Sequence, residues 1–318
     1  MKLFIQKIFF SFLFLIISLG GCGEFKGNYE EVEKSVSSSS IFVAVSNNGD
    51  VIKSSDGVNW ESINMDNPTS TSFENVKYIN DHFAIVGTLG GIYFSNDGIA
   101  WESKSYNTTD SLFDINYGNN IYLITGQNNT LLKSNDGSNW SSSTTSGLQY
   151  FNFDGENFIS KSGISNNGSN FGSIGSDNGY SLKILNNNYI FISNNNPYTP
   201  NVNCSNNGAN LFRSTDGINW LQVSDSKLSN ICLYDVSYGN GIYVTVGSSG
   251  TILTSYNLSN WTSRTSGLSV TFRGIAFGNG VFIVVGDSGT ILTSQDGITW
   301  TERVSKHSNQ INAISFSK

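Results

Sequence analysis

A seven-residue motif, Ser-x-Asp-Gly-x-x-Trp, recurs along the 318-residue chain and constrains its fold more than any other feature. All six tryptophans close a copy of this motif. The copies are SSDGVNW (54–60), SNDGIAW (95–101), SNDGSNW (134–140), STDGINW (214–220), SYNLSNW (255–261) and SQDGITW (294–300). The tryptophans are spaced by 41, 39, 80, 41 and 39 residues, and the double interval holds a seventh copy, SNNGSNF (165–171). The chain is therefore built from a repeat of about forty residues.

Each copy of the motif belongs to a set of four short apolar runs. Before the last copy come FRGIAFGNG (272–280), VFIVVG (281–286) and TILTS (290–294), and equivalent runs precede the other copies. Short β-branched runs separated by Gly-containing turns are typical of antiparallel hairpins. Four such strands in every repeat predict the blade of a β-propeller, because only neighbouring blades can cover both apolar faces of one small sheet. We name the strands of a blade A to D, with A innermost and the motif joining C to D.

The two ends of the repeat region predict how the ring closes. The first run, IFVAVS (41–46), is a B strand without an A strand before it, and the last, INAISFSK (311–318), is an A strand without a B strand after it. We expect residues 311–317 to complete the first blade. The predicted fold is all-β: a seven-bladed β-propeller over residues 41–318, with four antiparallel strands per blade and a short, frayed fourth blade between 157 and 171.

The repeated turn residues have structural roles that follow from their chemistry. The Asp side chain can accept hydrogen bonds from the backbone N–H groups ahead of it, and Gly supplies a backbone conformation that other residues resist. The Trp covers apolar surface on the adjacent blade, and its N–H needs an acceptor. The structural repeat residues are Asp56, Trp60, Asp97, Trp101, Asp136, Trp140, Asp216, Trp220, Trp261, Asp296 and Trp300. They lie one blade apart on the outer rim and cannot converge, so we expect no metal site and no cofactor.

The motif resembles the Asp-box repeat of sialidase-type (BNR) propellers, and still more the related repeats of photosystem II assembly-factor propellers. Every copy in this chain lacks one residue of the longer Asp-box form. The assembly-factor resemblance implies a scaffold that holds a partner protein. The photosynthetic members use a basic patch, and no such patch can be read from this chain.

The sialidase resemblance implies three arginines that converge on a substrate carboxylate, a Tyr–Glu nucleophile pair and an acid. The chain has four arginines, and the predicted strands separate them: Arg264 and Arg303 fall on outer D strands, Arg213 on a C strand and Arg273 on an inner A strand. The carboxylates on A strands are Glu74, Asp114 and Asp235. The two histidines, His82 and His307, lie apart at strand ends or in loops. We therefore predict no catalytic residues and keep a sialidase-like glycoside hydrolase as the alternative.

The first 21 residues have the features of a bacterial lipoprotein signal peptide. Lys2 and Lys7 are their only charged residues, and an apolar run, IFFSFLFLIISL (8–19), follows. The run has the length of a secretory signal and is short for a membrane span. LGGC (19–22) resembles the lipobox of bacterial lipoproteins, which implies lipidation of Cys22. Ordinary secretion without lipidation is the alternative.

Residues 22–40 are expected to form a flexible tether between the lipid and the propeller, since GEFKGNYEEVEKSVSSSS (23–40) has little apolar content. After residue 21 the chain carries 15 basic and 24 acidic side chains, a net charge of −9, and no basic run. This charge argues against binding to nucleic acid or to anionic lipid. We expect a monomer at the bacterial cell envelope, at the outer membrane or cell surface, with membrane contact through the lipid anchor only.

The fifth repeat contains a long insertion, NNNPYTPNVNCSNNGA (194–209), between its B and C strands. In an up-and-down blade the B–C and D–A connections share one face, so Cys204 in the insertion and Cys232 in the next D–A connection lie on the same face. We expect a disulfide between them, worth about 3.5 kcal/mol in the chain-entropy model. Two unpaired thiols are the alternative.

The insertion also supplies the candidate binding residues, Tyr198, Asn201 and Asn203, because a long loop on a rigid scaffold often carries function. A loop that is merely tolerated at a blade tip is the other interpretation. The sequence as a whole predicts a non-catalytic binding or scaffold propeller for a protein or glycan partner at the envelope.

Overall fold

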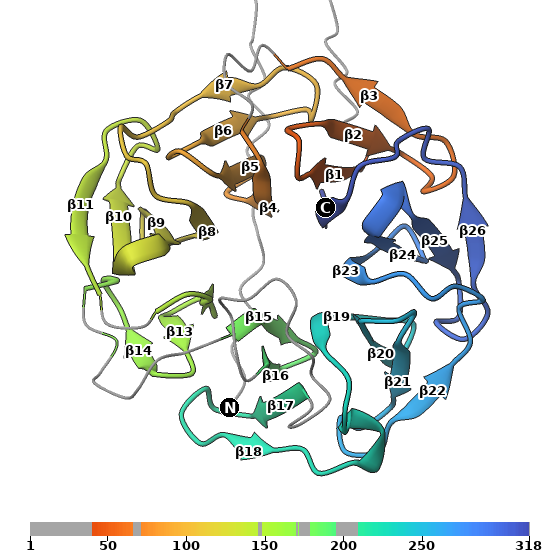
Figure 1. The fold of residues 1–318 in the computed structure, drawn as a ribbon. Coiled ribbons are helices and arrows are strands. Elements are labelled where there is room, and N and C mark those ends of the chain that lie inside the picture. Colours follow the sequence, from red (N-terminus) through yellow and green to blue (C-terminus); the bar gives the residue numbers. More distant parts are fainter. Residues whose placement is uncertain are drawn as a thin grey trace, which may run out of the picture. The chain divides into compact units, whose positions relative to one another are not determined.

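The computed structural model describes residues 40–65, 71–145, 148–169, 171, 179–194 and 209–317. The chain divides into two compact units, Met1–Ser37 and Ser38–Lys318, and every described residue belongs to the second. This unit is a ring of seven antiparallel sheets around a central channel (Figure 1). The predicted seven-bladed β-propeller is therefore confirmed.

The first three blades, from innermost to outermost strand, are formed as follows. The first contains β27 (Ile311–Phe316), β1 (Phe42–Ser46), β2 (Val51–Ser54) and β3 (Glu61–Ile63). The second contains β4 (Phe73–Ile79), β5 (His82–Gly87), β6 (Ile92–Ser95) and β7 (Glu102–Ser103). The third contains β8 (Leu112–Gly118), β9 (Ile121–Gly126), β10 (Thr130–Ser134) and β11 (Ser141–Thr144).

The remaining blades continue around the ring in chain order. The fourth contains β12 (Asn152–Phe153), β13 (Phe158–Ser160) and β14 (Gly163–Ser165). The fifth contains β15 (Gly179–Leu185), β16 (Asn188–Asn194), β17 (Ala209–Ser214) and β18 (Leu221–Gln222). The sixth contains β19 (Leu233–Gly239), β20 (Ile242–Gly247), β21 (Ile252–Ser255) and β22 (Thr262–Arg264). The seventh contains β23 (Phe272–Gly278), β24 (Val281–Gly286), β25 (Ile291–Ser294) and β26 (Thr301–Arg303).

The fourth blade is the shortest, as the sequence predicts. It has three strands among the described residues, and its innermost strand, β12, is two residues long. Residues 172–178, which follow its copy of the motif, lie outside the described part of the chain. Single-turn 3₁₀ helices occur at Gln127–Asn129, Ser226–Leu228 and Asp287–Gly289.

The C-terminal strand closes the ring. β27 pairs antiparallel with β1, and Phe42 lies opposite Phe316 and Ala44 opposite Ile314. At the end of this pair the Ile41 N–H donates to Ser317 Oγ at 2.7 Å, and the Ser317 N–H donates to the Ile41 carbonyl oxygen at 2.9 Å. The first and last described segments therefore share one sheet, and β27 covers the inner edge of β1.

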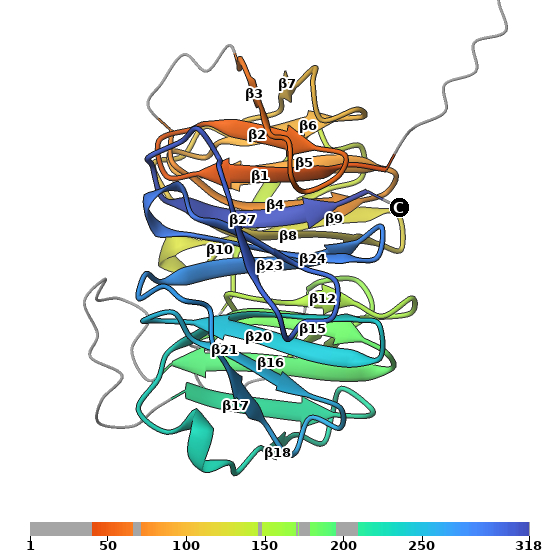
Figure 2. The ribbon, with the colours of Figure 1, turned by 90° about the vertical axis from the view of Figure 1, so that its right-hand side faces the viewer.

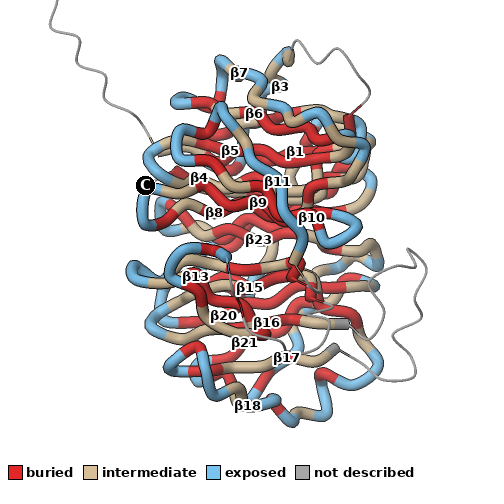
Figure 3. The backbone as a smooth tube through the Cα atoms, turned by 90° about the vertical axis from the view of Figure 1, so that its left-hand side faces the viewer, coloured by how far each residue is buried: buried red, intermediate tan, exposed pale blue. Residues whose placement is uncertain are grey.

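Apolar packing between blades covers both faces of the B strands of the first, second, third, sixth and seventh blades. On β5, Phe83 and Ile85 pack toward the first blade, while Ala84 and Val86 pack toward the third. A strand covered on both sides reads as a continuous apolar run, and HFAIVG (82–87) has this form. Buried residues consequently fill B strands such as β1, β5 and β9 (Figure 3).

The repeated turn between strands C and D has the predicted hydrogen bonds. In the first copy, Ser54 Oγ accepts from the Gly57 N–H at 2.8 Å, and Asp56 Oδ1 accepts from the Val58 and Asn59 N–H groups, both at 2.8 Å. These backbone donors hold the pKa of Asp56 well below its usual range. Gly57 has a φ of +74°. In SYNLSNW (255–261), buried Leu258 takes the place of this glycine and has a φ of +62°.

The tryptophans pack against adjacent blades as predicted, but only some of their indole N–H groups have a hydrogen-bond acceptor. Trp60 joins the cluster between the first and seventh blades, and Trp261 joins that between the fifth and sixth. The indole N–H groups of Trp60 and Trp300 donate to turn carbonyl oxygens at 3.1 and 3.2 Å. Those of Trp101, Trp140 and Trp261 are buried without an acceptor among the described residues, so the expected hydrogen bond is absent there. Apolar burial therefore decides where these rings lie.

Truncation of Ile311 tests the closing strand. Its side chain is 1% exposed and packs with Phe42 and Ile291, so we expect Ile311→Ala to lower the free energy of unfolding by about 2–5 kcal/mol. Urea denaturation provides the measurement. Val304→Ala is the control, because Val304 is 78% exposed and its truncation should change stability by less than about 0.5 kcal/mol. Equal effects of the two variants would contradict the packing of β27.

The turn aspartates should make stability depend on pH. The Thr299 and Ile298 N–H groups lower the pKa of Asp296 to about 2, against about 3.9 in an unfolded chain. A carboxyl with a depressed folded-state pKa stabilises the fold above its unfolded pKa and loses that contribution as the pH falls toward its folded pKa. At pH 5 we expect the unchanged chain to have a higher urea midpoint than the Asp296→Asn variant. At pH 3 this difference should be smaller. In SYNLSNW (255–261), Asn257 accepts the same hydrogen bonds from backbone N–H groups, so an Asn at position 296 should preserve the turn.

Candidate functional site

The ring has two faces, and the strand directions define them. The A–B and C–D turns lie on one face, which we call the turn face, and the B–C and D–A connections lie on the other, which we call the loop face. The described chain begins and ends on the turn face, where Ile41 contacts Ser317. Figure 2 shows the C-terminal end on this face, at the right.

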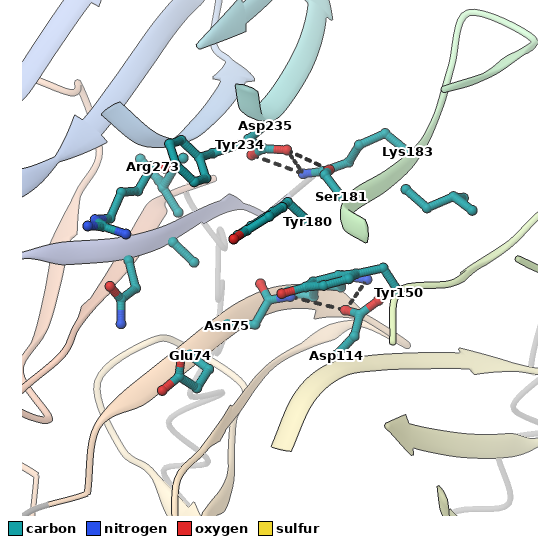
Figure 4. Close-up of a pocket in the computed structure, with 16 residues that line it drawn as sticks. Glu74, Asn75, Asp114, Tyr150, Tyr180, Ser181, Lys183, Tyr234, Asp235 and Arg273 are labelled. Atoms are coloured by element: carbon teal, nitrogen blue, oxygen red, sulfur yellow. Dashed lines mark hydrogen bonds and ion pairs between the residues drawn. The ribbon is translucent and has the colours of Figure 1, made fainter. Parts of the chain in front are cut away.

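A cavity of about 170 Å³ occupies the channel where the innermost strands begin, toward the loop face. We call it the channel cavity. Its walls come from the first residues of β4, β15, β19, β23 and β27, together with single side chains of the third and fourth blades. The residues labelled in Figure 4 are Glu74, Asn75, Asp114, Tyr150, Tyr180, Ser181, Lys183, Tyr234, Asp235 and Arg273.

Asp114 joins three consecutive blades. Its carboxylate, 1% exposed, pairs with Lys77 Nζ of the second blade at 2.5 Å and accepts from the Phe151 N–H of the fourth blade at 3.2 Å. Asn75 Nδ2 and the Ile115 N–H donate to it as well, both at 3.0 Å. Burial raises the pKa of Asp114 and lowers that of Lys77, and each charge opposes the shift of the other. These four donors, all from the protein itself, satisfy the hydrogen-bonding capacity of the Asp114 carboxylate.

Asp235 occupies the equivalent position three blades further on and makes the equivalent contacts. Lys183 Nζ of the fifth blade lies 3.3 Å from its carboxylate, and Ser181 Oγ donates to it at 2.9 Å. The Ile275 N–H of the seventh blade donates to it at 3.1 Å. Asp114 and Asp235 therefore act as clamps between blades, because each carboxylate binds the blade before its own and the blade after.

Three tyrosines form the aromatic part of the cavity wall. The rings of Tyr180 and Tyr234 meet edge to face with centroids 5.2 Å apart, and the guanidinium of Arg273 lies 5.8 Å from the Tyr234 centroid. Arg273 is also paired with Asp287 at 2.5 Å. Burial raises the pKa of Tyr150, Tyr180 and Tyr234, so these phenols stay protonated at neutral pH and serve as neutral hydrogen-bonding groups.

Glu74 differs from the other acids of the cavity. Its carboxylate accepts a long hydrogen bond from Ser72 Oγ at 3.4 Å, and among the described residues it forms no ion pair. Burial raises its pKa, while the charge of Arg273 partly offsets this rise. Glu74 is therefore a partly buried carboxylate without a cation of its own in the part of the chain that the structure describes.

The sequence-predicted site residues lie in three places. Glu74, Asp114, Asp235 and Arg273 come together at the channel cavity. Cys22, Tyr198, Asn201, Asn203 and Cys204 lie outside the described residues. Cys232 is buried directly before β19 on the loop face and is disulfide-bonded, but both other cysteines lie outside the described residues, so the Cys204–Cys232 pair stays a prediction.

The arginines do not converge. Arg264 and Arg303 hydrogen-bond to Thr254 and Thr293 on the outer hairpins, both at 2.9 Å, and Arg213 lies on β17. Arg273 alone of the four lines the channel cavity. The described part of the chain thus lacks the three-arginine site that the sialidase resemblance implies.

The histidines are also apart. The ring centroid of His82 lies 4.7 Å from that of Phe94 on the turn face, in a tilted contact, and His307 contacts Ser62 at 3.0 Å on the outer side of the loop face. The described residues contain no group of three or more His, Cys, Asp or Glu side chains that could hold a metal ion. They also contain no helix that is long and apolar enough to cross a membrane.

Sequence reasoning missed the tyrosines and lysines of the cavity. The pattern that could have found the tyrosines is the spacing of the two buried columns of strand A, exemplified by Phe73 and Val76; the lysines fall one residue beyond the second column and outside this pattern. The two residues between these columns border the channel in most blades, as Glu74 and Asn75 do in β4. Applied to the fourth, fifth and sixth repeats, this spacing selects Tyr150, Tyr180 and Tyr234.

Comparisons with known proteins support the fold. No protein-family profile and no curated protein sequence matches the chain. The structure of YCF48 bound to a D1 peptide has a TM-score of 0.58 and 19% identity, over 74% of this chain and 83% of that one. YCF48 from Cyanidioschyzon merolae has a TM-score of 0.58 and 16% identity, over 79% and 89%. A chain of the nidogen/laminin complex has a TM-score of 0.55 and 9% identity, over 88% and 98%. At these identities the likeness establishes the propeller fold alone.

The two carboxylate clamps should differ in strength. We expect Asp114→Asn to lower the free energy of unfolding by about 3–5 kcal/mol, because it leaves the Lys77 charge buried without a partner. Asp235→Asn is the matched change. It should cost less, since the Lys183 side chain is 29% exposed and can be solvated. Urea denaturation at pH 7 measures both. A larger loss for Asp235→Asn would show that the burial of the lysine does not set the cost.

Proposed function

We propose that this chain is a non-catalytic binding propeller that takes up a protein partner at its loop face. The observation that carries this proposal is the lining of the channel cavity. Its two best-buried carboxylates, Asp114 and Asp235, hold blades together, whereas three tyrosines and the Asn75 amide face the cavity. Aromatic and amide side chains on a rigid scaffold are typical of protein-binding surfaces.

The hydrogen bonding of Glu74 argues against the sialidase-like alternative. A Tyr–Glu nucleophile pair needs the carboxylate within hydrogen-bond reach of the phenol, and among the described residues Glu74 accepts from Ser72 Oγ rather than from a tyrosine. The separate positions of the four arginines remove the expected carboxylate-binding triad. YCF48, which is similar in fold, has been solved with a bound D1 peptide, so a propeller of this architecture can hold a peptide.

The proposal includes anchoring to a bacterial cell envelope through a lipid on Cys22, with residues 22–40 as the tether. The tether would join the propeller at Ser40 on the turn face, whereas the channel cavity lies toward the loop face. A monomer attached in this way would leave the cavity free for a partner. The insertion 194–209, with Tyr198, Asn201 and Asn203, leaves β16 on the loop face, and a Cys204–Cys232 disulfide would hold it beside Tyr234.

Site-specific photo-crosslinking in the cells that make this chain tests the binding function. A benzophenone amino acid replaces Tyr180 in the cavity or, as the matched control, Tyr256, which is 70% exposed on the turn face. We expect a discrete protein adduct at position 180 and none at position 256. Adduct formation at a carbohydrate polymer, or identical adducts at both positions, would contradict a protein partner at the loop face.

An enzymatic assay tests the non-catalytic part of the proposal. We expect the purified full chain to leave fluorogenic sialosides and other glycosides intact. Hydrolysis that disappears in both Arg273→Ala and Glu74→Gln, while Arg303→Ala keeps it, would establish the glycoside hydrolase instead.

A further inference from the structure

The cations of the channel cavity are all paired with aspartates, and one carboxylate is left over. Three cations face it or its rim, and each has its own aspartate: Lys77 pairs with Asp114, Lys183 with Asp235 and Arg273 with Asp287. The fourth carboxylate, Glu74, has no such partner among the described residues. The described lining holds three cations and three carboxylates, and because Asp287, outside the lining, pairs with Arg273, Glu74 is the lining carboxylate left without an ion pair.

The surroundings of Glu74 suit a positive charge on an apolar stem. Tyr150 and Tyr180 line the same cavity, and aromatic faces attract cations and pack against methylene groups. Asn75 Nδ2 donates to Asp114 and to the Phe113 carbonyl oxygen, which leaves the Asn75 amide oxygen as an acceptor (Figure 4). The site thus offers one carboxylate, neutral oxygen acceptors and aromatic surface, within about 170 Å³.

We propose that the channel cavity receives a primary ammonium group, the side chain of a lysine on the partner protein, which pairs with Glu74. This inference rests on the proposed binding function and names the chemistry that the cavity recognises. An ammonium on a four-carbon stem brings a compact positive charge with three donors to the acceptors of this cavity. A carboxylate would meet the unpaired charge of Glu74, and the cations Lys77, Lys183 and Arg273 are each already neutralised by an aspartate.

Short peptides test this recognition with the full chain in detergent solution. The probe is an acetylated and amidated Gly-Ser-Lys-Ser-Gly peptide, compared with peptides that carry norleucine, glutamate or arginine in place of lysine. We expect the lysine peptide to bind at least about tenfold more tightly than the norleucine peptide, as measured by thermophoresis. Equal binding of lysine and norleucine, or tighter binding of the glutamate or arginine peptide, would overturn the proposal.

Variants of the cavity identify the carboxylate. Glu74→Gln should weaken the lysine peptide at least about tenfold and leave the norleucine peptide unchanged, whereas Glu302→Gln on the outer strand β26 should change neither. Urea midpoints establish that both variants fold. Glu74→Lys is the second variant, and its preference should shift from the lysine to the glutamate peptide. Unchanged lysine binding in Glu74→Gln would place the ammonium elsewhere.

The crosslinking experiment separates this inference from the binding function. If position 180 captures the same protein in the Glu74→Gln background with undiminished yield, the ammonium site is wrong although the binding function stands. If no protein is captured in either background while the lysine peptide binds through Glu74, the ammonium site stands and the protein partner is wrong.

Discussion

The pairing of β1 with β27 is the constraint on which the rest of this structure depends. Each blade presents two apolar faces, and the ring covers all of them only if the seventh blade meets a complete first blade. The chain supplies that blade from its two described ends: β1 provides Phe42 and Ala44, and β27 provides Ile311 and Ile314, which pack with Ile283 and Val285 of the seventh blade. The closed ring then fixes the inner strands around a common channel, and that channel positions every residue of the candidate site.

The same ring explains why charged groups can lie at the channel. Asp114 and Asp235 are removed from water, and each would be costly to bury alone. Both are placed so that a lysine comes from the preceding blade and a backbone N–H from the following blade. These contacts use side chains from two blades and a backbone N–H from a third, so they form only when the ring is assembled. Glu74 takes no part in these contacts between blades, and for that reason we propose that it pairs with a lysine of the partner protein.

The fold could be predicted from the sequence because its signals are local and repeated. The turn motif fixes the C–D hairpins, and two buried columns, with Phe73 and Val76 as examples, mark each inner strand. The candidate site could be predicted only in part. Glu74 and Arg273 were assigned to inner strands, but Lys77 becomes a site residue through its contact with Asp114 of the next blade, which no single repeat encodes.

Hydrogen exchange of the closing strand tests the closed ring most directly. Mass spectrometry of the full chain can follow the backbone amides of residues 311–317 and compare them with those of β24, which lies inside the seventh blade. We expect both segments to exchange at the same slow rate, through unfolding of the whole ring, because β27 is hydrogen-bonded to β1 and packed on the seventh blade. Exchange of residues 311–317 within seconds, while β24 stays protected, would show that the strand frays from the first blade and that the ring is open.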